Sequence, residues 1–199
     1  MNENELLRAV YSTRLRDGTA SVHALSQALR WTPEEVTLRL EEASRERLVE
    51  ITGEEVSLTA AGRGRLTVVM IGGAFEIIHP GHIHTIEGAK RLGDTLVVVL
   101  AADRTVTKNK GREPVTPQEW RVRLVSALRE VDVALPGGQG SIYDMMEKVR
   151  PDVVALGYDQ KHNPQDIEHE ARNRGLKLSV VRLDSPIPGI KTSKIVSSL

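Results

Sequence analysis

The chain has 199 residues, of which 40% are apolar and 27% charged, and its formal net charge is zero. This composition is ordinary for a globular protein and gives no overall attraction to nucleic acid or to an anionic membrane. The absence of cysteine excludes disulfides, thiol nucleophiles and Cys-ligated metals. Because there is no run of eighteen apolar residues and no signal-peptide pattern, we expect a cytoplasmic protein without a membrane partner.

Helical patterns and a hairpin pattern fill the first 65 residues. Apolar residues recur with helical spacing in two segments, and a third begins with Thr32-Pro33, a cap followed by proline at the first helical position. Two β-prone runs then flank the turn Thr52-Gly53-Glu54-Glu55. We expect helices at 5–15, 22–29 and 33–46 and a hairpin at 48–51 and 56–58. This order resembles a winged helix-turn-helix domain over residues 1–65, a small and mainly α-helical unit.

The expected recognition helix of this domain is acidic. Segment 33–46 carries five glutamates against two arginines, and residues 1–65 hold nine Lys and Arg against eleven Asp and Glu. Phosphate contacts supply most non-specific affinity for DNA, so this helix would repel DNA. DNA binding stays open, but we favour docking, dimerisation or ligand sensing.

Strands and helices alternate over residues 66–199. Runs rich in Val, Ile and Leu need cover on both faces, and their alternation with helical patterns favours an α/β fold. The expected architecture is a Rossmann-like, doubly wound parallel sheet, with ligands beyond the carboxyl ends of its strands. We expect strands at 66–70, 95–102, 131–135, 153–156 and 177–183, and helices at 81–92, 116–129, 141–149, 164–174 and 192–198.

A glycine pair and two histidines follow the first of these strands. Gly72 and Gly73 let a ligand approach the backbone because they lack Cβ, and Gly81 leaves the first turn of the next helix uncovered. The free N–H groups of that turn favour an anion. His79 and His82 are three residues apart, so both can donate to one phosphate. Metal ligation by the pair and a purely structural role are the alternatives.

The same stretch resembles the signature G-x-F-D-x-x-H-x-G-H of the nucleotidyltransferase superfamily. The residues that match are Gly73, Ala74, Phe75, His79, Gly81 and His82. The resemblance implies that they bind the nucleotide and that the two histidines are catalytic. Glu76 stands where the family usually has Asp, which leaves the contact of this carboxylate open.

A basic loop is expected after the second strand, from Arg104 to Arg112. Such a loop by itself is most often a solvated surface. The family places phosphate-binding lysines here, so the resemblance implies a catalytic role for Lys108 or Lys110 without deciding between them. Arg121 matches a family arginine that helps to bind triphosphate, and a surface salt bridge is the alternative.

Two further segments complete the expected nucleotide site. Gly157, Tyr158 and Asp159 follow the fourth strand, where the family binds base and ribose, with Tyr158 as the stacking surface; a turn without ligand contact is the alternative. The segment Gly189-Ile190-Lys191-Thr192-Ser193 opens the last helix and offers a second anion site. It resembles the second signature of the family but lacks its arginine, whose charge Lys191 could replace.

The resemblance implies nucleotidyl transfer, in which an acceptor phosphate attacks the α-phosphorus of a nucleoside triphosphate and releases pyrophosphate. We expect Mg²⁺ with the triphosphate, no metal site of the protein's own, and the homodimer usual in the family. Residues 66–199 look most like archaeal FAD synthases, which join FMN to the AMP of ATP. The alternatives are a CTP-dependent cytidylyltransferase acting on glycerol phosphate or a related acceptor, a nucleotide-sensing transcriptional regulator, and an enzyme whose N-terminal unit regulates its own synthesis.

Overall fold

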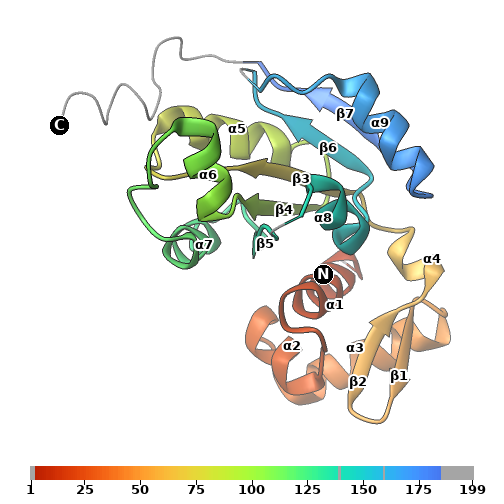
Figure 1. Ribbon diagram of the computed structural model, residues 1–199. Helices are drawn as coiled ribbons and strands as arrows, with labels where there is room; N and C mark the ends of the chain where they lie inside the picture. Colours follow the sequence, from red (N-terminus) through yellow and green to blue (C-terminus); the bar gives the residue numbers. More distant parts are fainter. Residues whose placement is uncertain (1–2, 139, 159, 185–199) are drawn as a thin grey trace. The chain divides into compact units, whose positions relative to one another are not determined.

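The structure is a computed structural model that describes residues 3–138, 140–158 and 160–184 (Figure 1). The described residues form two compact units that divide after Thr67. Within the described ranges, no helix combines the length and the apolar character that crossing a membrane requires.

The described part of the first unit contains three helices, an antiparallel hairpin and a short final helix. These elements are α1 (Glu3–Asp17), α2 (Val22–Leu29), α3 (Pro33–Arg45), β1 (Val49–Thr52), β2 (Glu55–Leu58) and α4 (Ala60–Arg63). The side chains of Ser21 and Thr32 cap α2 and α3 by accepting backbone N–H groups at 3.2 Å. The elements follow the expected order, while the winged helix-turn-helix assignment stays a prediction.

The described residues of the second unit form a five-stranded parallel sheet with the strand order β5-β4-β3-β6-β7. Its strands are β3 (Val68–Gly73), β4 (Thr95–Leu100), β5 (Val133–Pro136), β6 (Val153–Leu156) and β7 (Ser179–Arg182). Its helices are α5 (Pro80–Lys90), α6 (Asp103–Lys110), α7 (Gln118–Ser126), α8 (Ile142–Val149) and α9 (Pro164–Asn173). This topology confirms the predicted Rossmann-like, doubly wound α/β fold.

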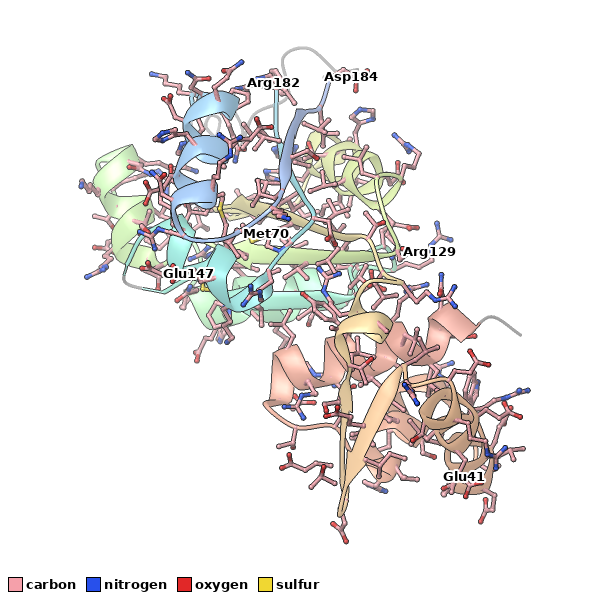
Figure 2. The ribbon with its side chains drawn as sticks, turned by 90° about the vertical axis from the view of Figure 1, so that its right-hand side faces the viewer. Glu41, Met70, Arg129, Glu147, Arg182 and Asp184 are labelled. Carbon is pink, nitrogen blue, oxygen red and sulfur yellow. The ribbon has the colours of Figure 1, made fainter. Side chains whose placement is uncertain are left out.

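Helices cover both faces of the sheet. On one face, Ile71 of β3 packs with Ile86 of α5 in a buried apolar cluster. On the other face, a Cβ placed on Gly72 would meet Ile142 of α8 at 3.4 Å. Met70, which is fully buried, lies in the interior of this unit (Figure 2). Because neither face meets water, the central strands are apolar at nearly every position.

Two expectations about local structure are wrong. The first strand of the sheet ends at Gly73 rather than at Met70, because Gly73 continues the pairing with β4 and accepts from the N–H of Ala101 at 2.8 Å. The basic segment 104–112 is mostly the helix α6 and not a loop; Gly111, at a φ of 69°, ends it in the left-handed conformation. The other described elements lie where expected, with ends shifted by a few residues.

The strand order places a crevice at the carboxyl end of β3. The connection from β3 to β4 runs through α5 on one face, whereas the connection from β5 to β6 runs through α8 on the other. β3 therefore lies between β4, which the chain enters next, and β6, which it enters only after β5 (Figure 1). Such a switch point is where open α/β sheets bind their ligands.

Candidate active site

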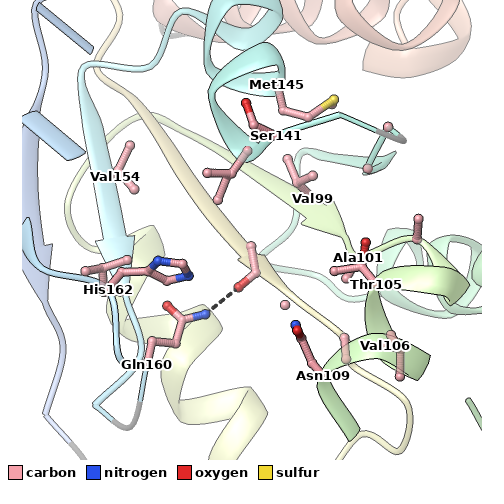
Figure 3. Close-up of a pocket in the computed structure, with 18 of the residues that line it drawn as sticks. Val99, Ala101, Thr105, Val106, Asn109, Ser141, Met145, Val154, Gln160 and His162 are labelled. Carbon is pink, nitrogen blue, oxygen red and sulfur yellow. Dashed lines mark hydrogen bonds between the residues drawn. The ribbon is translucent and has the colours of Figure 1, made fainter. Parts of the chain in front are cut away.

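Two cavities meet at the carboxyl end of β3. The larger, of about 480 Å³, lies between the strand ends, α6 and α8 (Figure 3). The smaller, of about 190 Å³, is lined by Phe75, His82 and Thr85. Both cavities include residues 72–74 and Gln160. One reacting centre at the end of β3 could therefore be reached by two ligands at once.

The larger cavity is mainly apolar, with polar groups at its edge. Its apolar lining includes Val99, Val106, Ile142, Met145 and Leu156. Its polar lining includes Thr105, Asn109, Lys110, Ser141 and His162. A pocket of this size and character suits a flat, largely apolar ring system held in orientation by a few hydrogen bonds.

Gln160 joins the two sides of the crevice. Its Nε2 donates to the carbonyl oxygen of Gly72 at 2.8 Å, drawn as a dashed line in Figure 3. Its Oε1 accepts from the N–H of Gly157 at 3.0 Å. The loop after β6 is thereby tied to the end of β3, and a ligand that spans both cavities would contact this side chain.

The two histidines lie together at the start of α5. His79 occupies the position before its first residue, and its ring stacks on that of His82 at a centroid distance of 3.8 Å. Nδ1 of His82 lies 3.1 Å from the carbonyl oxygen of Ile77. A carbonyl oxygen can only accept, so this Nδ1 carries the hydrogen. Protonation at Nε2 would then make His82 a donor from both nitrogens.

One ring nitrogen of His79 lacks a hydrogen-bond partner among the described residues. Its Nδ1 is buried and has no hydrogen-bond partner in the described part of the chain. Burial lowers the pKa of His79, which favours the neutral ring when no anion is present. A phosphate oxygen or a water at the start of α5 could supply the missing partner.

Phe75 packs beside the paired histidines. It is a non-glycine residue with a φ of 47°, in the left-handed region, and its buried ring lies 5.0 Å from the His82 ring. A Cβ on Gly73 would come within 2.8 Å of Phe75 Cε2. The turn from β3 to α5 therefore requires glycine at position 73.

We expect Gly73→Ala to lower the unfolding free energy by about 1–3 kcal/mol, because the Phe75 ring must move from its packed position. Gly72→Ala is the matched control, since its Cβ would meet the nearest atom, Ile142 Cδ1, at 3.4 Å, an ordinary contact. Urea unfolding followed by circular dichroism measures both variants. Equal unfolding midpoints for the two variants would contradict the steric argument.

Glu76 has specific contacts although it departs from the family's aspartate. Its side chain is completely buried and pairs with Lys110 and with Arg112, at 2.9 Å from Oε1 to Nη1. The N–H of Val115 also donates to Oε1, at 3.1 Å. Burial alone would raise the pKa of Glu76, but the hydrogen bonds from Lys110, Arg112 and Val115 outweigh it and lower the pKa to about 2.

This low pKa predicts a loss of stability in acid. The pKa of Glu76 falls from 4.5 to about 2 on folding, so the unfolded chain binds a proton at higher pH than the folded chain does. The stabilisation is complete above about pH 4.5 and is lost as the pH falls towards 2. Urea unfolding at a series of pH values should show a weaker acid dependence for Glu76→Gln than for the wild type. The exposed Glu113 gives the control, Glu113→Gln, which should retain the wild-type dependence.

Arg121 is buried and engaged with the protein. Its Nη1 donates to the carbonyl oxygen of Ala74 at 2.5 Å, and its Nη2 to that of Ala101 at 2.8 Å and to Asp103 at 2.6 Å. Its Nε donates to the carbonyl oxygen of Thr116 at 3.1 Å. The guanidinium therefore joins the segments that follow β3 and β4. The surface salt bridge considered from the sequence does not describe this interior position.

The structure brings some of the predicted residues together and leaves others apart. Ala74 lines both cavities and Gly157 the smaller one, while Gly81 lies in the first turn of α5. Lys110 lines the larger cavity, whereas Lys108 and the exposed Tyr158 line neither. Asp159 and the segment Gly189–Ser193 (Gly189, Ile190, Lys191, Thr192 and Ser193) lie outside the described residues.

One wall of the larger cavity was not predicted from the sequence. The glycine-rich segment after β5, with Gly137, Gly138 and Gly140, lines it and leads into Ser141 at the start of α8. Glycines between a strand and a helix were a usable indication of this wall. Among the described residues, no group of three or more His, Asp or Glu side chains is arranged to hold a metal ion.

A doubly wound parallel sheet with paired histidines at the first helix after its central strand defines the class of protein. It is a nucleotidyltransferase with the His-x-Gly-His signature at residues 79–82. Residues 70–198 match the family described as cytidylyltransferase-like, and the chain belongs to this family.

The similar proteins include archaeal FAD synthases. That of Pyrococcus horikoshii is 41% identical over 141 residues, which are 69% of this chain and 95% of the relative. That of Ferroglobus placidus is 47% identical over 115 residues, 58% of this chain and 74% of the relative. The solved structure of a lipopolysaccharide core biosynthesis protein from Thermoplasma volcanium is 37% identical, with a TM-score of 0.59, and covers 61% of this chain and 99% of its own. These findings confirm the predicted likeness to archaeal FAD synthases.

The unit before Thr67 distinguishes this chain from the Pyrococcus horikoshii relative. The family match begins at residue 70, and the match to the relative already uses 95% of that protein. The relative thus has no room for a counterpart of the first unit. The nucleotidyltransferase part accordingly exists elsewhere without this addition.

Proposed function

We propose that this protein is an FMN adenylyltransferase, which joins FMN to the AMP part of ATP and releases pyrophosphate. The observation that carries the proposal is the 41% identity to an FAD synthase across 95% of that protein. The two cavities that meet at residues 72–74 support it, because the reaction needs two substrates whose phosphates meet at one point.

The chemistry requires positioning and charge stabilisation more than a protein nucleophile. A phosphate oxygen of FMN forms a bond to the α-phosphorus of ATP while the bond from that phosphorus to the α,β-bridging oxygen breaks. The electron pair leaves with pyrophosphate. His79, His82 and the N–H groups at the start of α5 would bind the α-phosphate, and a lysine of α6 would bind charge shared by donor and acceptor. The acceptor phosphate is already anionic at neutral pH, so no general base is needed.

The larger cavity fits the flavin better than the smaller one does. It is about 480 Å³ and mainly apolar, whereas the smaller, of about 190 Å³, contains the signature histidine His82. We assign the isoalloxazine ring to the larger cavity and the triphosphate to the histidine side. The FMN phosphate would then reach the α-phosphate beside Gly73 and Gln160.

A divalent metal would enter with the nucleotide as part of the substrate. We expect this metal to be a Mg²⁺ ion bound by the triphosphate oxygens and by water. Its role would be to neutralise charge on the leaving pyrophosphate. The side chains of the protein would act on the remaining phosphate oxygens.

The test is product analysis with a matrix of substrates. Purified full-length protein is incubated with ATP or CTP and with FMN or glycerol 3-phosphate, and FAD, CDP-glycerol and pyrophosphate are measured. We expect FAD from FMN and ATP only. Formation of the cytidylyl product, with no FAD, would favour the cytidylyltransferase alternative. Tight nucleotide binding without any product would favour the regulator.

Besides its substrates, the protein could bind a partner through its first unit or pair with a second copy of the chain. Both arginines of α3 are paired with glutamates, Arg39 with Glu42 at 2.8 Å and Arg45 with Glu41 at 3.4 Å, and Glu41 lies on the outer surface of α3 (Figure 2). We therefore propose a winged-helix unit for protein or ligand contacts; micromolar binding of duplex DNA at physiological salt would contradict this. The homodimer stays a prediction, which light scattering measures.

A further inference from the structure

The buried carboxylate of Glu76 contacts two cations that still face solvent. The side chains of Lys110 and Arg112 are each 34% exposed, whereas that of Glu76 is 0% exposed. Lys110 also lines the larger cavity. Each cation thus has one side against the carboxylate and another available to an anion. Two positive charges against one negative charge leave the cluster with a net positive charge beside the cavity.

We propose that Glu76 is a positioning residue that, together with Arg112, holds Lys110 at the edge of the larger cavity, where Lys110 binds the phosphate charge shared by donor and acceptor. This inference rests on the proposed function and adds to it a choice between the two candidate lysines. Lys110 lines the cavity and contacts Glu76, whereas Lys108 lines neither cavity. Lys110 is therefore the phosphate ligand.

The physical benefit of such a contact is preorganisation. A solvated lysine has several rotatable bonds, and ordering it on a phosphate costs side-chain entropy. A fixed carboxylate that orders the side chain in advance removes part of this cost from the binding step. The bond from Val115 N–H to Oε1 adds to this, because it ties the segment after Arg112 to the same carboxylate.

The contacts of the carboxylate depend on the length of the Glu76 side chain. Its two oxygens divide the contacts, since Oε1 accepts from Arg112 and Val115 while Oε2 accepts from Lys110 and Arg112. Removing one methylene draws the carboxylate back by about 1.5 Å, and a shorter side chain cannot keep all of these contacts. The structure thus accounts for Glu at a position where the family has Asp: the longer side chain reaches α6.

A double-mutant cycle tests whether Glu76 acts through Lys110. Glu76→Gln keeps the shape and removes the charge, and Lys110→Met removes the phosphate ligand; kcat/KM is measured for both substrates in each single variant and in the double variant. We expect a loss of roughly 100-fold for Lys110→Met, about what deleting one transition-state donor costs. For Glu76→Gln we expect roughly 10-fold, and the double variant should be no worse than Lys110→Met within about 3-fold. Losses that multiply would overturn the proposal, because they would show that Glu76 acts independently of Lys110.

Controls separate positioning from folding. Glu113→Gln removes an exposed carboxylate from the same segment, and Lys148→Met removes an exposed lysine from α8; both should keep wild-type activity. Circular dichroism establishes that each variant is folded. If Glu76→Gln does not fold, Glu76→Asp replaces it in the cycle, and a wild-type kcat/KM for that variant would overturn the role of side-chain length.

A binding experiment separates this inference from the proposed function. Calorimetric titration with inorganic tripolyphosphate measures phosphate binding without requiring FMN or turnover. Weaker binding to Lys110→Met and Glu76→Gln, without further loss in the double variant, supports the inference even if the wild type makes no FAD. Unchanged tripolyphosphate affinity in both single variants, in an enzyme that does make FAD, would overturn the inference and leave the proposed function standing.

Discussion

Replacing His82 by alanine is expected to lower kcat for FAD synthesis by roughly 10²–10³-fold, equivalent to about 2.7–4 kcal/mol of transition-state stabilisation. The Nδ1 hydrogen of His82 is used by the carbonyl oxygen of Ile77 at 3.1 Å, which fixes the orientation of the ring. The ring lines the smaller cavity, where we assign the triphosphate. Negative charge develops on the α-phosphate oxygens during transfer, so a fixed donor there acts mainly in the transition state.

His84 provides a matched control in the same helix. It lies two residues further along α5, contacts Asp184 at 3.3 Å and lines neither of the two cavities at the end of β3. His84→Ala should therefore keep near wild-type kcat. Single-turnover measurements of FAD formation would separate chemistry from product release in all three proteins. A His82→Ala variant with near-normal turnover would show that the α-phosphate is held elsewhere.

The centre of the site could be predicted from the sequence because its determinants are local. The glycines at 72 and 73 and the histidines at 79 and 82 occupy one strand, one turn and one helix start, so spacing alone brings them together. The alternation of apolar runs and helical segments likewise determines the sheet. The structure adds the stacking of the two rings at 3.8 Å, which spacing cannot give.

The helical conformation of the basic segment could not be predicted from local spacing. Residues 103–110 contain a single buried apolar side chain, Val106, so no apolar stripe indicated a helix. The helix is supported instead by long-range contacts, since Glu76 lies 34 positions before Lys110 in the chain. Pairings of this kind between distant residues leave no periodic pattern, which is why the choice between Lys108 and Lys110 stayed open.

The surroundings of Arg121 could be predicted from the sequence even less well. From the sequence it could bind triphosphate or form a surface salt bridge, because neither the 47-residue separation from Ala74 nor its burial is visible in a helical pattern. In the structure its three guanidine nitrogens all donate to protein oxygens. The nucleotide contact stays a prediction, and stability and binding measurements can separate the two roles.

Arg121→Met is expected to lower the unfolding free energy by about 2–4 kcal/mol, a large part of the total stability of a typical domain. The change leaves the half-buried carbonyl oxygens of Ala74 and Ala101, and that of Thr116, without this donor, and an acceptor that loses its partner costs about 1–3 kcal/mol where water does not replace it. Asp103 is 40% exposed, so water can replace part of its contact with the guanidinium. Urea unfolding of the full-length protein measures the loss.

Arg123→Met is the matched control, because Arg123 lies on the exposed side of the same helix and its loss should change the unfolding free energy by less than about 0.5 kcal/mol. The two roles of Arg121 then predict opposite patterns. A structural role gives a large loss of stability with a KM for ATP that stays near the wild-type value in the folded fraction. A triphosphate contact gives a raised KM with little loss of stability, and that result would mean that the guanidinium leaves Ala74 and Ala101 when the nucleotide binds.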